Sequence, residues 1–203
     1  MQRLRYLLIL DFEATCGDDL QGKSEIIEFP TLMYNLERDE VETTFHEYVR
    51  PILNPVLTSF CTELTGITQD VVDRANTFRN VWARFQEFMK LNDLFENPTS
   101  CAFLTCGNWD LQTMLPEQLA LSGFDASSDL VPPYNRWINV KKAFRKYYGM
   151  KHPPGGMLQM LQKLDLELEG RHHSGIDDCR NILRIVRKMR MDGWRPAGDL
   201  TRW

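Results

Sequence analysis

The chain has 203 residues, is 43% hydrophobic and 26% charged, and carries a net charge of −4 at pH 7. These values are typical of a globular protein, and the length predicts one domain spanning residues 1–203. No apolar run reaches the length of a transmembrane helix or of a signal-peptide core, which excludes a membrane-spanning protein and a secretion signal.

The cysteines indicate the cellular compartment. There are five of them, an odd number, scattered along the chain and never in a C-x-x-C pair. This pattern argues against a disulfide framework or a zinc ribbon. We therefore expect a reducing, intracellular location, cytoplasmic, nuclear or both.

The charge is unevenly distributed. Residues 136–203 hold 15 Lys and Arg against 7 Asp and Glu, a net charge of +8, whereas residues 1–135 carry −12. A basic last third can face the phosphates of a nucleic acid although the whole chain is acidic. The alternative is a solvated helix face without a ligand.

The first half of the chain predicts three strands. Residues 6–10 form an unbroken apolar run, too short for a core helix and bounded by charge, which is typical of a central strand covered on both faces. Residues 26–34 and 43–49 are predicted as the next two strands, and Pro51 ends the third. Their short connections favour an antiparallel meander.

Strands then alternate with helices. Thr77 begins a helix whose apolar side chains recur at helical spacing from Phe78 to Met89. Residues 101–105 and 137–140 are predicted as strands, and residues 111–121, 141–148, 157–164 and 175–191 as helices, with short helical turns within 59–73. The pattern indicates an α/β fold with a mixed five-stranded sheet flanked by helices.

Asp11 and Glu13 follow the first strand, two positions apart. Because side chains alternate along a strand, both carboxylates leave the sheet on the same face. Two adjacent anions are tolerated at a hydrophobic edge when a multivalent cation neutralises them, and hard oxygen ligands suit Mg²⁺ or Mn²⁺. For this pair alone, an ordinary strand end entering a polar loop is the alternative.

Asp110 follows the strand at residues 101–105 and begins a helix. The helix dipole favours a carboxylate there, so N-terminal capping is one explanation for it. The same position places Asp110 at the edge of the sheet where Asp11 and Glu13 emerge, and the site residues of open α/β sheets gather at that edge.

Residues 170–179 lead into the last helix. Ser174 and Asp177 have the spacing of a capping box, which explains Asp177 structurally. Asp178 remains, and a carboxylate on the core side of a helix is costly unless it is paired or bound to a metal. His173 can titrate near neutral pH, with a plain surface-loop histidine as the alternative, and His172 is predicted to be its exposed neighbour.

Together these residues resemble the DEDDh exonucleases, which have the DnaQ-like, ribonuclease H-like fold. Asp-x-Glu ends a first strand, an aspartate follows a later strand, and His-x-x-x-x-Asp enters the last helix. The similarity is more specific to the Eri-type 3′→5′ exoribonucleases and extends from about Leu4 to Met191. The matching motifs are Leu10-Asp-Phe-Glu-Ala-Thr-Cys16, Glu25-Ile-Ile-Glu-Phe-Pro30, Phe60-Cys-x-x-Leu-Thr-Gly-Ile-Thr68, Thr105-Cys-Gly-x-Trp-Asp110, Trp137-Ile-Asn-x-Lys-Lys142 and Gly170-Arg-x-His-Ser-Gly-Ile-Asp-Asp-Cys179.

The resemblance implies a single DEDDh exonuclease domain that removes nucleoside 5′-monophosphates from RNA 3′ ends by a two-metal hydrolysis. RNA processing, RNA decay and the regulation of small RNAs are the processes that it suggests. It implies that two Mg²⁺ or Mn²⁺ ions are held by four carboxylates: Asp11, Glu13, Asp110 and Asp178. His173 is then the general base, and Glu13 takes part in catalysis as well.

The resemblance also implies which residues contact the terminal nucleotide. They are Glu13, Ala14, Thr15, Phe60, Trp109 and His173. Phe60 and Trp109 would bracket the base, and packing in the core is the alternative for both rings. The basic helix faces at Arg180, Arg184, Arg187 and Lys188 and at Lys141, Lys142, Arg145 and Lys146 are candidates for a surface that follows the phosphates.

Two other functions remain open. One is a DNA 3′→5′ exonuclease of repair or cell-death type. The other is a non-catalytic RNA-binding scaffold with the same fold, which the presence of all five predicted catalytic residues disfavours. The sequence identifies no protein partner.

Overall fold

The computed structural model describes residues 4–18 and 20–202 of the chain. Its strands are β1 (Tyr6–Leu10), β2 (Glu13–Ala14), β3 (Ile26–Asn35), β4 (Glu40–Arg50), β5 (Asn76–Thr77), β6 (Cys101–Thr105), β7 (Arg136–Asn139) and β8 (Thr201–Arg202). Across the sheet they lie in the order β5-β4-β3-β1-β6-β7-β8, and β2 pairs with β3.

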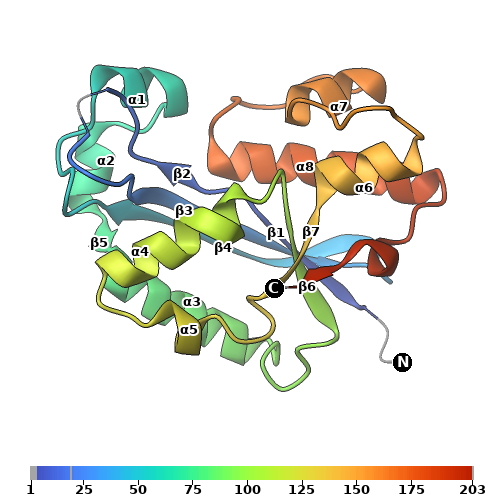
Figure 1. The fold of residues 1–203 in the computed structure, drawn as a ribbon, viewed down its shortest axis with the longest axis horizontal. Helices are drawn as coiled ribbons and strands as arrows, with labels where there is room; N and C mark the ends of the chain where they lie inside the picture. Colours follow the sequence, from blue (N-terminus) through green and yellow to red (C-terminus); the bar gives the residue numbers. More distant parts are fainter. Residues whose placement is uncertain (1–3, 19, 203) are drawn as a thin grey trace.

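Helices follow β4, β5, β6 and β7 along the chain. They are α1 (Ser59–Thr65), α2 (Gln69–Arg74), α3 (Phe78–Leu91), α4 (Leu115–Leu121), α5 (Ala126–Asp129), α6 (Val140–Tyr147), α7 (Met157–Lys163) and α8 (Gly175–Met191). A π-helical turn, η1 (Asp110–Met114), precedes α4, and a 3₁₀ turn, η2 (Pro196–Asp199), precedes β8. In Figure 1, α6, α7 and α8 lie on one side of the sheet and α3, α4 and α5 on the other.

The predicted fold class is confirmed. β1, β3 and β4 pair antiparallel, as the short connections predict, whereas β6 and β7 run parallel to β1. The five predicted strands form the body of this mixed sheet. Within the described ranges the structure adds β2, β5 and β8, which have two residues each and are too short to show a hydrophobic period.

β1 supplies the centre of both layers of the core. Leu7 and Ile9 pack beneath the helices α6, α7 and α8, while Leu8 and Leu10 pack against α3 and the η1–α4 segment. All four side chains are at most 1% exposed, as the unbroken apolar run predicts for a strand covered on both faces. Burying a side chain of this size stabilises the fold by about 1.5–3 kcal/mol.

β3 is one continuous strand even though it contains Pro30. β1 pairs with it as far as Leu10, which lies opposite Thr31, and β2 resumes the pairing where Glu13 lies opposite Glu28. Pro30, which lacks a backbone N–H, lies at the level of the gap between β1 and β2 and opposite His46 of β4. The same gap leaves residues 11 and 12 outside the sheet ladder, at the edge where the carboxylates emerge.

The helix predicted over residues 111–121 begins differently from the prediction. Its first turn is π-helical, with the N–H of Leu115 bonded to the carbonyl of Asp110. The cause is Pro116, which cannot donate to the carbonyl four residues earlier and whose ring excludes that carbonyl from α geometry. No helix in the described part of the chain is long and apolar enough to cross a bilayer, and the five cysteines are free thiols.

Candidate active site

Three of the predicted ligands come together past the ends of β1 and β2. Carboxylate oxygens of Asp11, Glu13 and Asp178 lie within 4.8 Å of one another. Asp11 follows β1, Glu13 begins β2, and Asp178 lies in the first turn of α8. The structure thus brings Asp11 and Glu13 together and adds a third acid that is distant in the sequence.

Gly175 lets α8 approach the sheet closely enough for this. A Cβ at this position would lie 2.6 Å from the carbonyl oxygen of Asp11 and 3.0 Å from Cγ of Pro30. Any side chain would therefore push the first turn of α8 away from β1 and β3. The absence of a side chain at Gly175 places Asp178 beside Asp11.

Asp110 is held at the same edge. Its Oδ1 accepts a hydrogen bond of 3.0 Å from the N–H of Phe12, the residue between Asp11 and Glu13. The carboxylate is buried, and it binds the β1–β2 connection as well as beginning its own helix. Asp110 therefore joins β6 and η1 to the segment that carries the first two acids.

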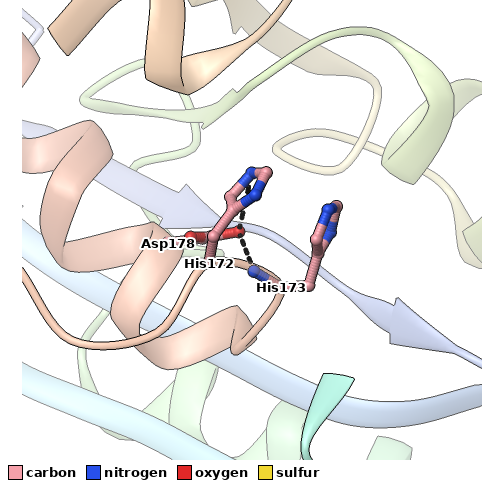
Figure 2. A group of neighbouring side chains, drawn as sticks. All are labelled: His172, His173 and Asp178. Carbon is pink, nitrogen blue, oxygen red and sulfur yellow. Dashed lines mark hydrogen bonds and ion pairs between the residues drawn. The ribbon is translucent and has the colours of Figure 1, made fainter. Parts of the chain in front are cut away.

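Asp178 also shapes the loop that carries His173. Its Oδ2 accepts the backbone N–H of His173 at 3.0 Å, and His173 has a left-handed backbone with φ of 64° (Figure 2). Asp178 Oδ1 is buried and has no hydrogen-bond partner among the described residues. One oxygen thus fixes the loop, and the other is free to bind a cation.

His172 is not the exposed neighbour that we expected. Its side chain is half-buried, its Nε2 lies 4.0 Å from Asp178 Oδ2, and its ring centroid is 3.8 Å from that of His173 (Figure 2). The turned backbone at His173 brings both rings to the same side of the loop, so alternation along the chain does not separate them. The two imidazoles and Asp178 form a second group of atoms within 4.8 Å.

The hydrogen bonds of Ser174 and Asp177 also differ from those of the predicted capping box. Ser174 is the N-cap residue of α8, but its side chain makes no capping hydrogen bond. Asp177 accepts the N–H of Arg171 at 3.1 Å and pairs with Arg180 at 2.8 Å. Asp177 therefore closes the loop before the helix and is not one of the three acids whose oxygens lie together.

The acidic residues raise one another's pKa. Burial is the largest cause for each of them, and the charges of neighbouring carboxylates add to it for Asp11, Glu13 and Asp178. The pKa of Asp11 lies well above its usual value, that of Glu13 is raised to about 9 and that of Asp178 to about 7. The pKa of Asp110 is raised to about 6 by burial, which its bond with Phe12 opposes.

The two histidines shift in the opposite direction. Burial lowers the pKa of His173 below its usual 6.5, and the charge of Arg171 lowers it further. Burial and the neighbouring His173 ring lower the pKa of His172 in the same way. Both imidazoles are therefore neutral at physiological pH, which suits a group that accepts a proton.

This donor set fits a divalent cation. The acids are all hard oxygen ligands and repel one another when ionised, and a buried oxygen of Asp178 lacks a hydrogen-bond partner in residues 4–18 and 20–202. A cation would remove the repulsion and restore the ionised carboxylates. The arrangement of these acids thus supports a cation-binding role.

The melting temperature of the metal-free protein should show the cost of burying these carboxylates together. The folded state binds the proton of Asp178 up to about pH 7, whereas the unfolded carboxyl releases it near its usual 3.8. Because the folded state binds more protons between these values, this carboxyl destabilises the fold increasingly as the pH rises through that window. The melting temperature of Asp178→Asn in EDTA should therefore rise relative to that of the wild type from about pH 5 to about pH 7, and the difference should level off above that.

The difference in melting temperature between the two proteins separates the effect of Asp178 from that of the histidines. Their lowered pKa values make the fold more stable as the pH rises, which is the opposite direction. Saturating Mn²⁺ at the higher pH should raise the melting temperature of the wild type more than that of Asp178→Asn. Melting curves of the two proteins that remain parallel across this range would contradict the argument.

A pocket of about 260 Å³ opens over the acidic group. Its lining residues are Asp11, Phe12, Glu13, Ala14, Thr15, Cys16, Ser24, Leu64, Trp109 and His173. Of the residues predicted to bind the terminal nucleotide, it therefore contains all except Phe60. The hydroxyl of Thr15 accepts the N–H of Glu25 at 2.9 Å, so this side chain also closes the loop below the pocket.

The two predicted aromatic residues are not part of the core. Phe60 is 55% exposed and Trp109 is 46% exposed, although large aromatic rings are usually buried. Trp109 lines the pocket, while α1 presents Leu64 to it, one turn after Phe60. Leu64 is not among the predicted site residues, yet its spacing of four residues from Phe60 places both on one face of α1.

The two predicted basic faces, on α8 and α6, differ in how many of their cationic side chains pair with a carboxylate. On α8 every one of the four predicted cations contacts a carboxylate: Arg180 with Asp177, Arg184 with Glu169, Arg187 with Asp39 and Lys188 with Asp192. On α6, Lys146 pairs with Asp199, and Lys141 donates to the carbonyl of Gly155. The charge of the α8 face is therefore largely neutralised within the protein.

The fold and the site together define a class of protein. A mixed sheet between two helical layers, with carboxylates gathered past its central strands, is an α/β protein of the ribonuclease H-like class with an acidic site for cations. The chain belongs to the exonuclease family designated RNase_T, which it matches over residues 8–186. The predicted resemblance to the DEDDh exonucleases of Eri type is confirmed.

Similar proteins agree with this assignment. ERI1 exoribonuclease 3 of Homo sapiens is 44% identical over 193 residues, which are 95% of this chain and 56% of that protein. The 3'-5' exonuclease Snipper of Drosophila melanogaster is 34% identical over 209 residues, covering 95% of this chain and 72% of its own length. The chain thus spans about half the length of the first of these relatives.

Solved structures show the same fold. The nuclease domain of 3'hExo, a DEDDh family member bound to rAMP, superposes with a TM-score of 0.84 at 40% identity and covers 94% of both chains. The cell-death related nuclease CRN-4 superposes with a TM-score of 0.82 at 32% identity, covering 94% of this chain and 65% of its own.

Proposed function

We propose that this chain is a metal-dependent 3′→5′ exoribonuclease that releases nucleoside 5′-monophosphates from RNA 3′ ends. The observation that carries the proposal is the group of Asp11, Glu13 and Asp178, whose carboxylate oxygens lie within 4.8 Å of one another, together with a pocket lined by Asp11, Glu13 and His173. Membership of the exonuclease family and the likeness to a nuclease domain bound to rAMP support it. RNA processing, decay or the regulation of small RNAs is the setting we infer.

Four carboxylates would hold the cations: Asp11, Glu13, Asp110 and Asp178. Two Mg²⁺ or Mn²⁺ ions match four negative charges, and such ions, when bound, acidify water and neutralise the charge that develops on the phosphate. The free Oδ1 of Asp178 and the closely spaced oxygens of Asp11 and Glu13 are the donors most open to them. Asp110 would be the fourth cation ligand. Its Oδ1 also accepts the N–H of Phe12, which anchors that residue.

His173 is proposed as the general base. Its imidazole lines the pocket, and its lowered pKa keeps it neutral at physiological pH. It can therefore accept a proton from the attacking water and later return it to solvent. The bond from its N–H to Asp178 ties the position of the base to that of a cation ligand.

The terminal nucleotide would enter between Ala14 and Thr15 of the β2 end and the ring of Trp109, with Glu13 near its sugar. Trp109 is exposed on the pocket wall, so its face is available for stacking on a base. Phe60 and Leu64 project from the same face of α1 and would close the other side. Stacking tolerates any base, which suits an exonuclease that proceeds along a strand.

Trp109→Ala should weaken substrate binding more than it slows the chemical step. Loss of one stacked base costs about 1–3 kcal/mol, which corresponds to a KM for a short oligonucleotide higher by roughly 5- to 150-fold. Steady-state kinetics with Leu91→Ala as the control measures this, because Leu91 is also a large exposed apolar side chain but lies on α3, outside the pocket lining. An unchanged KM for Trp109→Ala would remove this ring from the proposed site.

The activity is tested with 5′-labelled RNA and DNA of the same sequence, single-stranded and as duplexes with 3′ overhangs, with and without Mg²⁺ or Mn²⁺. We expect a ladder of RNA shortened from its 3′ end, with mononucleotide as the second product, only when the cation is present. Equal rates on DNA would favour the second candidate, a DNA 3′→5′ exonuclease of repair or cell-death type; one structure similar to this chain is that of a cell-death related nuclease. RNA bound but left intact would favour a non-catalytic scaffold.

A further inference from the structure

Glu28 is a buried carboxylate beside the active site that the predicted ligand set does not include. It lies within β3, is 1% exposed, and is paired in register with Glu13 of β2 and with Tyr48 of β4. A buried carboxylate is costly unless hydrogen bonds or ion pairs compensate for its lost hydration. The contacts of Glu28 therefore indicate its role.

Both oxygens of Glu28 bind the first turn of α8. Oε2 accepts the N–H of Gly175 at 2.9 Å, and Oε1 accepts the N–H of Ile176 at 3.1 Å. The first N–H groups of a helix have no partner inside the helix, and the helix dipole favours an anion at that end. Glu28, from a different element, thus caps α8 where the side chain of Ser174 does not.

A third donor completes the environment of Glu28. Nε2 of His46, on β4, lies 2.8 Å from Oε1. With two backbone amides and an imidazole on its two oxygens, Glu28 is already satisfied by the protein. Asp178 differs from it in this respect, because Oδ1 of Asp178 has no hydrogen-bond partner within the described part of the chain.

We propose that Glu28 is a positioning residue, which fixes α8 on the sheet so that Asp178 and His173 reach Asp11 and Glu13. The path is continuous: Glu28 holds Gly175 and Ile176, α8 carries Asp178, and Asp178 holds the backbone of His173. Gly175 allows α8 to come close to the sheet, and Glu28 holds the helix there. The expected effect on kcat rests on the proposed function. The placement of α8 by Glu28 does not.

The chain contains a matched control. Glu25 lies directly before β3, is 4% exposed, and its two oxygens accept the N–H groups of Ile52 and Asn54 at 2.7 Å and 2.6 Å. It resembles Glu28 in burial and in bonding two backbone amides. The segment that it holds follows β4 and carries none of the proposed ligands.

The experiment compares Glu28→Gln, Glu25→Gln and the unaltered chain. Glutamine keeps the shape of the side chain but replaces one acceptor with an NH₂ group that faces the helix amides. In Glu28→Gln we expect the Gly175 and Ile176 amides to exchange hydrogen at least about tenfold faster. Affinity for Mn²⁺, measured from the free ion by electron paramagnetic resonance, and kcat should each fall by about 10- to 100-fold, with KM for the oligonucleotide unchanged.

Glu25→Gln should retain the Mn²⁺ affinity, the kcat and the amide exchange of α8, even if it lowers the melting temperature. Equal losses of Mn²⁺ affinity in the two variants, or unchanged exchange at Gly175 and Ile176 in Glu28→Gln, would overturn the proposal. If Glu28→Gln does not fold, Glu28→Asp carries the same test, because it keeps the charge and withdraws it by one methylene. A wild type without nuclease activity would refute the proposed function, while amide exchange and Mn²⁺ binding would still decide the role of Glu28.

Discussion

We expect Asp178→Asn to lower turnover of a 3′-ended RNA by at least about 1,000-fold, because a cation ligand supplies several kcal/mol of charge stabilisation and each 1.36 kcal/mol is a factor of ten. The asparagine can still accept the N–H of His173, so the loop keeps its anchor. What is lost is the charge and the buried Oδ1 that has no partner among the described residues. Initial rates at saturating Mg²⁺, together with Mn²⁺ binding, measure the effect.

Asp177→Asn is the matched control for this substitution. Asp177 is the neighbouring acid on the same helix, but its carboxylate contacts Arg171 and Arg180 and is not among the three whose oxygens lie together. Its loss should cost surface ion-pair stability of about 1 kcal/mol or less and leave turnover of the same order as in the wild type. If the two variants lose activity equally, the cation site does not lie where we place it.

His173→Ala should reduce turnover by about 100- to 10,000-fold, the usual contribution of a general base. The acids that bind the cation are untouched, so Mn²⁺ affinity should be nearly unchanged. In the wild type, activity should fall as the pH drops through the pKa of His173, which burial places below 6.5, because protonation removes the base. The residual rate of His173→Ala should lack this acid limb.

His172→Ala separates the base from its neighbour. The two rings are in contact and both have a lowered pKa, yet only His173 lines the pocket. We therefore expect His172→Ala to retain the acid limb and to change turnover far less than His173→Ala. A His172→Ala variant that loses the acid limb, with His173→Ala keeping it, would exchange the roles of the two imidazoles.

Some parts of the site follow from local sequence alone. The strand ending at Leu10 is fixed by its apolar run, and the alternation of side chains then places Asp11 and Glu13 together. Asp178 stands out because a capping role explains Asp177 but not its neighbour, although the bonds of Asp177 differ from a capping box. These arguments need only the period of a strand or a helix, which is why the structure confirms their placement.

Other parts depend on contacts between distant residues. Glu28 caps a helix that begins 147 residues later, and the α8 face is neutralised in part by Asp39, which lies 148 residues before Arg187. His172 is half-buried because the backbone turns at His173, which spacing does not reveal. A glutamate inside the apolar run at the start of β3 was the available signal for Glu28, since a charge in a buried strand requires a partner.

The most direct test of the account is anomalous diffraction from crystals of this protein soaked in Mn²⁺ and a nucleoside 5′-monophosphate. We predict manganese peaks among Asp11, Glu13, Asp110 and Asp178, with the phosphate of the nucleotide next to them and His173 facing it. Peaks confined to other acidic surfaces, or a nucleotide bound away from the pocket beside Trp109, would contradict the proposed active site.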